Sequence, residues 1–110
     1  MNEEERSDDV EKKEERRDEG DNSIFIGGKP FMNYVTGVVM QFTTKQADEV
    51  TVKARGKFIS RAVDVAEVAV KRFLQGQSAI KDIKIDSDEF ENKEGRKVRV
   101  SSIEIILKKT

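Results

Sequence analysis

The chain has 110 residues, of which 39% are charged, and its formal net charge at pH 7 is −1. This length is typical of one compact domain, and the composition predicts a surface dense in ions of both signs. The sequence contains neither cysteine nor histidine, which excludes disulfides and sulfur-ligated metals and removes the commonest general base. An enzyme is therefore disfavoured, and we expect no metal and no cofactor. Apolar runs are too short for a signal peptide or a membrane span, so we expect a cytoplasmic protein without a membrane partner.

The near-zero net charge hides a division of the chain. Residues 1–21 contain five basic and eleven acidic side chains, a net charge of −6. Such a segment buries too little apolar surface to offset the entropy of ordering, so we expect a disordered, acidic N-terminal arm. Residues 22–110 hold the other 16 basic and 11 acidic side chains, a net charge of about +5. This basic part should fold, and its charge suggests a polyanionic partner.

The folded part opens with a strand and a helix. Residues 23–26 are β-branched or aromatic and stop at Gly27-Gly28, which predicts a strand that ends in a turn. Pro30 suits a first helical turn, and Gly37 inside the helix suggests close packing against a neighbouring backbone. Apolar residues recur at helical spacing at Phe31, Tyr34, Val35, Val38, Val39 and Phe42. This spacing favours core positions over a platform on which bases stack.

A second strand and helix follow. Residues 49–54 alternate apolar and polar side chains, which predicts a half-buried strand, and Gly56 marks the turn after it. The second helix should run from about Phe58 to Leu74, and its apolar spacing places Phe73 in the core. A contact between neighbouring copies is the alternative for Phe73.

The last third predicts two strands joined by a projecting hairpin. Ile80, Ile83 and Ile85 mark the first strand, and residues 103–107 alternate along the second. The polar stretch between them is too long for a tight turn, so both strands should continue as a hairpin arm with its tip near 92–95. The predicted fold is a two-layer α/β domain, βαβαββ, with a four-stranded mixed sheet and both helices on one face.

Basic residues of the folded part fall at the two predicted helix starts and on the hairpin arm. The candidate residues are Lys29, Lys53, Arg55, Lys57, Arg61, Arg96, Lys97 and Arg99. Helix N-termini attract anions and disfavour cations, so lysines at both starts indicate an external anion such as phosphate. Exposed cations are common in any globular domain, however, so an ordinary solvated face is an equal alternative.

Two familiar ion-binding motifs are absent. The turn GGKP lacks the remaining residues of a P-loop. In the acidic stretch of residues 86–91, Phe90 and Glu91 occupy positions where a calcium-binding EF-hand needs a ligand and a glycine. These carboxylates are expected to be solvated.

Three blocks together, IFIGGKPFMNYV, VKARGKFISRAVDVAEV and EGRKVRVSSIEIIL, resemble the Alba family of archaeal chromatin proteins over about residues 23–109. The resemblance implies a homodimer that binds double-stranded DNA and RNA without marked sequence preference. It implies phosphate contacts at Lys29, Lys53, Arg55 and Lys57, and hairpin arms directed to the minor groove. The family commonly has a lysine where this chain has Gly28.

Our leading hypothesis is a nucleoid-associated protein that coats or compacts DNA as a dimer and assembles further along it. In this hypothesis Arg96, Lys97 and Arg99 reach into a groove. An RNA-directed role, as an RNA chaperone or ribonucleoprotein subunit, is the alternative on the same fold. A scaffold that docks an acidic protein is the alternative from another class. We also expect the acidic N-terminal arm to compete with nucleic acid for the basic face.

Overall fold

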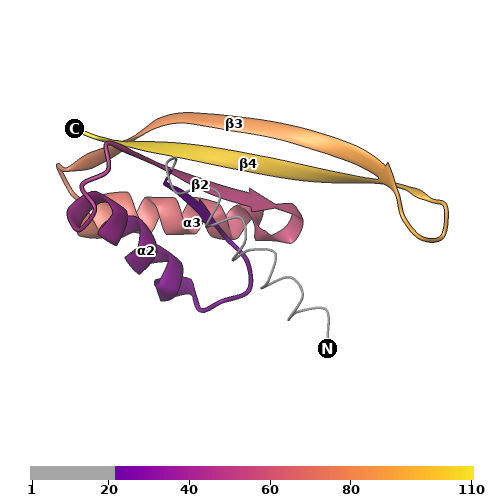
Figure 1. Ribbon diagram of the computed structural model, residues 1–110, viewed down its shortest axis with the longest axis horizontal. Helices are drawn as coiled ribbons and strands as arrows, with labels where there is room; N and C mark the ends of the chain where they lie inside the picture. Colours follow the sequence, from indigo (N-terminus) through magenta and orange to yellow (C-terminus); the bar gives the residue numbers. More distant parts are fainter. Residues whose placement is uncertain (1–21) are drawn as a thin grey trace.

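The computed structural model describes residues 22–110, so the acidic N-terminal arm expected for residues 1–21 lies outside the described part. The elements, in order, are β1 (Ser23–Phe25), α2 (Phe31–Thr43), β2 (Glu49–Arg55), the short 3₁₀ helix η1 (Gly56–Phe58), α3 (Ile59–Val68), the π-helical turn η2 (Ala69–Phe73), β3 (Ser78–Glu91) and β4 (Lys97–Lys109). They form two layers, with one sheet against two helices (Figure 1). The predicted βαβαββ fold is confirmed.

The four strands lie in the order β1-β2-β4-β3. β1 is parallel to β2, and the other two pairs are antiparallel. Along β2 the side chains of Val50, Val52 and Ala54 are buried, whereas those between them are not. Because successive side chains of a strand point to opposite faces, the sheet has an inner face against the helices and an outer face away from them.

Helix α2 packs an apolar stripe on the inner face. Tyr34, Val35, Val38 and Phe42 are buried there, and Phe31 packs against the same core, so the predicted core position of the aromatic residues is confirmed. The expectation for Gly37 is wrong. A Cβ at this position would meet only the Cδ1 atom of Ile24, at the ordinary contact distance of 3.6 Å.

The second helical segment changes its hydrogen-bonding pattern before it ends. The N–H of Leu74 donates to the carbonyl of Ala69 at 2.9 Å, five residues back, as in a π-helix. Leu74 is consequently 1% exposed and lies in the core, whereas Phe73 is 50% exposed. The prediction of a core position for Phe73 is therefore wrong, because the wider turn shifts the apolar face by one residue.

β3 and β4 extend past β2 and α3 as the predicted hairpin arm (Figure 1). At the tip, Asn92 Oδ1 accepts the N–H groups of Glu94 at 2.9 Å and Arg96 at 3.0 Å. Gly95 adopts a φ of +81°, which a residue with a side chain rarely takes. These contacts close a compact loop between the two long strands.

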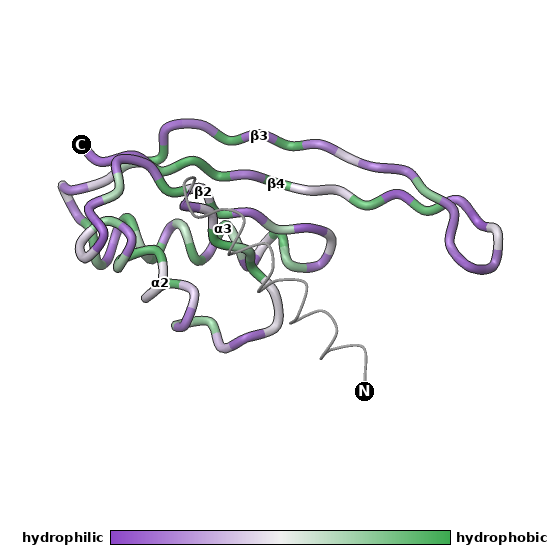
Figure 2. The backbone as a smooth tube through the Cα atoms, in the orientation of Figure 1, coloured by the Kyte–Doolittle hydropathy of each residue, from purple (hydrophilic) through white to green (hydrophobic). Residues whose placement is uncertain are grey.

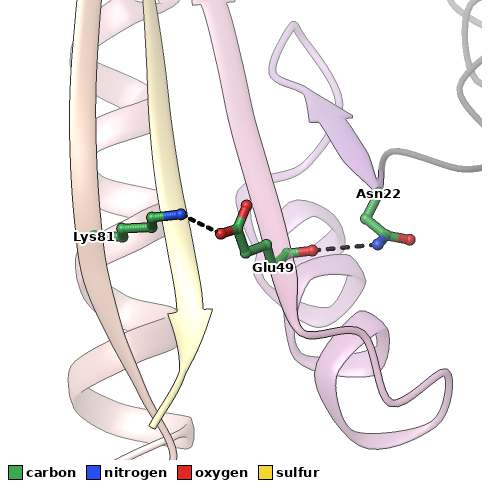
Figure 3. A network of polar contacts seen from close by, with 3 residues as sticks. All are labelled: Asn22, Glu49 and Lys81. Carbon is green, nitrogen blue, oxygen red and sulfur yellow. Dashed lines mark hydrogen bonds and ion pairs between the residues drawn. The ribbon is translucent and has the colours of Figure 1, made fainter.

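The opposite end of the sheet is joined by a small polar network (Figure 3). Asn22 Nδ2 donates to the carbonyl of Glu49 at 3.2 Å, and the Glu49 carboxylate accepts a hydrogen bond from Lys81 Nζ. That bond raises the pKa of Lys81 above its usual value. Lys81 occupies a β-bulge of the edge strand β3, between residues 80 and 82, so the bulge directs its side chain across β4 toward β2.

Candidate nucleic-acid interface

The loop between β1 and α2 is organised around one hydroxyl group. Tyr34, in the first turn of α2, accepts the backbone N–H of Gly27 at 2.9 Å and that of Lys29 at 3.0 Å on its Oη atom. The residue is 7% exposed, so its ring is fixed in the core while its hydroxyl reaches the loop. The backbone that carries Lys29 is thereby held in place, and the lysine side chain extends from it to solvent.

Arg61 holds the same loop from the other helix. It lies in the first turn of α3, its Nη2 atom donates to the carbonyl of Lys29 at 2.8 Å, and its guanidinium carbon lies 5.9 Å from the centre of the Tyr34 ring. A guanidinium has five N–H donors, so others remain that can bind an anion. The sequence indicated only a cation at this position and gave no sign of its contact with the loop.

Lys53 and Arg55 project from the outer face of the sheet, since the residues that alternate with them on β2 are buried. Lys53 Nζ lies 5.3 Å from the centre of the Phe25 ring. Arg55 Nη2 lies 4.0 Å from the Asp88 carboxylate of β3, in a pair whose side chains are both more than 60% exposed. Such a solvated pair contributes little to stability, so Arg55 is available to another anion.

Lys57 completes the group at the turn into α3. Gly56 has a φ of +57° and allows the chain to turn into η1, and Lys57 Nζ lies 5.4 Å from the centre of the Phe58 ring. The loop after β1, the C-terminal end of β2, η1 and the first turn of α3 thus bring five predicted residues to one end of the body. We call this group the cationic end; its members are Lys29, Lys53, Arg55, Lys57 and Arg61.

The other three predicted cations lie on the hairpin arm, which extends from the same end of the body (Figure 1). Arg96 is at the tip, and Lys97 and Arg99 lie on β4. The register places Glu91 opposite Lys97 and Glu89 opposite Arg99. Residues 86–101 include five acidic and four basic side chains, a net charge of −1. The hairpin arm is therefore not cationic as a whole. The sequence analysis considered only its basic residues and missed this balance of charge.

Within residues 22–110, no group of three or more acidic side chains is placed to hold a metal ion. In the same part of the chain, no helix has the length and apolar character needed to cross a membrane.

These features define a small two-layer α/β domain with cations gathered at the end from which a two-stranded arm projects. The family model described as Alba matches residues 22–87. The chain therefore belongs to the Alba family.

The family assignment agrees with individual relatives. A protein of Nanoarchaeum equitans named "DNA/RNA-binding protein Alba" is 59% identical over 87 residues, which are 78% of this chain and 96% of the relative. "DNA/RNA-binding protein Alba" of Methanococcus maripaludis is 49% identical over 87 residues, 79% of this chain and 97% of the relative. The solved structure of Alba from Thermoplasma volcanium superposes with a TM-score of 0.70 at 45% identity, covering 79% of this chain and 99% of that one.

Proposed function

We propose that this protein binds double-stranded DNA and RNA without marked sequence preference and coats or compacts DNA in the nucleoid. The observation that carries the proposal is the gathering of five cations at one end of the body, next to the base of the hairpin arm. Cations on a strand end, loops and a helix start suit contacts to the phosphate backbone, which carry no sequence information. The names of the relatives, which are DNA/RNA-binding proteins, support the same conclusion.

In this proposal Lys29, Lys53, Arg55 and Lys57 bind phosphates. Arg61 has two roles, because it holds the carbonyl of Lys29 and offers its remaining N–H donors to the same backbone. The cations of the hairpin arm, Arg96, Lys97 and Arg99, contact the groove and its edges.

We also propose that the protein acts as a homodimer through the inner face of β3. Ile83 and Ile85 are 53% and 79% exposed, and the register pairs them with the buried Ile105 and Ile103 of β4. The core thus continues as an apolar strip that the helices leave uncovered, and a second copy would bury it. An Ile85→Lys variant should sediment as a monomer, whereas Lys84→Ala, on the opposite face of the same strand, should leave the dimer intact.

Phe73 is proposed as a contact between neighbouring dimers, because half of its surface is exposed at the end of the second helical segment. A Phe73→Ala variant should bind a short duplex normally but coat long DNA with less cooperativity. Normal cooperativity on long DNA would contradict this role.

The function is tested by fluorescence-anisotropy titration of equal-length duplex DNA and duplex RNA across a salt series. Four phosphate contacts in each protomer predict a log–log slope on DNA of about −3.6 per protomer, because each neutralised phosphate contributes about −0.9. Lys29→Gln should reduce the slope by about 1, and Lys45→Gln, at the far end of α2, should leave it unchanged. Affinity that does not change with salt would contradict the proposal, and a clear preference for RNA would favour the RNA-directed role.

Position 28 offers a test by gain of affinity. A Cβ at Gly28 would meet nothing within 4 Å, so a lysine there fits without strain. Gly28→Lys should increase the affinity for both duplexes and steepen the salt slope by about one phosphate. Gly28→Gln, of similar length but neutral, is the matched control and should do neither.

A further inference from the structure

The distal part of the hairpin arm has two different faces. Phe90 of β3 lies directly opposite Val98 of β4, and Val100 follows two residues later on the same side. The charged pairs Glu89–Arg99 and Glu91–Lys97 alternate with these residues and so point to the other side. Asp88, opposite Val100, is on the same side as Phe90 and lies beside Arg55. Phe90 is 47% exposed. In Figure 2 the backbone of both strands includes hydrophobic residues, drawn in green, near the end of the arm. We call Phe90, Val98 and Val100 the apolar arm face.

Charge alone does not explain how this arm would stay on a polyanion. Residues 86–101 have a net charge of −1, and the cations on β4 lie opposite glutamates of β3. Counterion release by such a segment is small, since Lys97 and Arg99 each lie opposite a glutamate. An arm that contacts nucleic acid needs another attractive surface, and the apolar arm face is the one it presents.

The apolar arm face is continuous with the cationic end. The register places Arg55 opposite Ser102, on the outer face of the sheet, and Val100 and Val98 follow on that same face. Val98 is four positions before Ser102 on β4, a distance of about 13 Å. A duplex lying along this face therefore reaches Lys53, Arg55 and the apolar arm face together. The apolar strip of Ile83 and Ile85 is on the inner face, so the proposed dimer leaves this surface free.

We propose that Phe90 is an apolar wedge that enters the minor groove and partly unstacks one base step of the bound duplex. Minor-groove proteins use Phe, Leu, Ile, Met or Pro for this purpose, and the wedge bends DNA toward the major groove. Val98 and Val100 support the ring and contact the sugars of the groove wall. This inference rests on the proposed nucleic-acid binding and adds a deformation of the duplex that phosphate contacts do not produce.

The test uses a short duplex with 2-aminopurine at successive positions, because the fluorescence of this base rises when it unstacks. The full-length wild-type protein should raise the signal at one or two steps. Phe90→Ala should abolish the rise and weaken binding about tenfold, while the salt slope stays the same. Phe90→Leu should keep part of the signal, because leucine also acts as a wedge. Met40→Ala removes an apolar side chain of α2 that is also 47% exposed and has no place in the proposed interface, and this variant should bind and unstack like the wild type.

The outcomes separate the wedge from the proposed function. If wild type binds with a steep salt slope and Phe90→Ala gives the same affinity and fluorescence, the wedge is refuted and the nucleic-acid binding stands. If Phe90→Ala instead changes the sedimentation of the free protein, the apolar arm face covers a second copy and the wedge is refuted. If wild type binds neither duplex at low salt, both proposals fail.

Discussion

Removal of the Tyr34 hydroxyl tests whether the loop that carries Lys29 depends on it. In Tyr34→Phe the ring stays in the core, but the N–H groups of Gly27 and Lys29 lose their acceptor. Gly27 is buried, and a buried donor without a partner costs about 1–3 kcal/mol, whereas the exposed Lys29 N–H can bond to water. We therefore expect the free energy of unfolding to fall by about 1–3 kcal/mol.

The measurement is thermal unfolding followed by circular dichroism, at one protein concentration because a dimer gives concentration-dependent midpoints. Each kcal/mol lowers the Tm of a domain of this size by about 4–8 °C. Thr43→Val is the matched control. It also removes a hydroxyl, but one that is exposed and donates to the Val39 carbonyl within α2. Its Tm should change little. A Tyr34→Phe midpoint equal to that of the wild type would refute the argument that this hydroxyl holds the loop.

Three further changes give distinct signals. Gly37→Ala should raise the free energy of unfolding by up to about 1 kcal/mol, measured by chemical denaturation, because the added Cβ makes one ordinary 3.6 Å contact and the helix propensity improves. A lower free energy of unfolding would mean that α2 packs too closely on β1 to accept a methyl group. Asp88→Asn should increase DNA affinity more than Asp82→Asn, which changes the net charge equally, because Asp88 lies beside Arg55 and Asp82 does not. Equal increases would show that net charge alone explains the effect. Removal of residues 1–21 should tighten binding most at low salt, since their net charge is −6, and unchanged affinity would show that this segment does not compete.

Local periodicity was sufficient to predict the elements, their order and the position of the hairpin tip. It failed at Phe73 because the change to π-helical hydrogen bonding depends on packing around Leu74, which no spacing of residues 58–74 reveals. The expectation for Gly37 failed for a related reason. Its neighbour is a side chain of β1, and only the packed structure shows the distance to it.

The candidate site was predictable in its charges but not in its supporting contacts. Spacing identified the lysines and arginines, and the fold brings five of them to one end of the body. The hydrogen bonds of Tyr34 and Arg61 join residues five to 32 positions apart, so no local pattern contains them. The acidic residues opposite Lys97 and Arg99 were visible in the sequence, but their effect depends on the register of two strands.

The bulge at Lys81 has a consequence for how copies of this protein coexist. β3 is 14 residues long and, among the described residues, pairs only with β4, so its other edge offers free backbone groups to a passing strand. Exposed edges of this kind seed aggregation, and proteins block them with bulges and charged side chains. β3 has both, with its bulge at Lys81 followed by Asp82, Lys84 and Asp86. In the proposed coating of DNA, neighbouring copies would then touch through side chains without fusing their sheets.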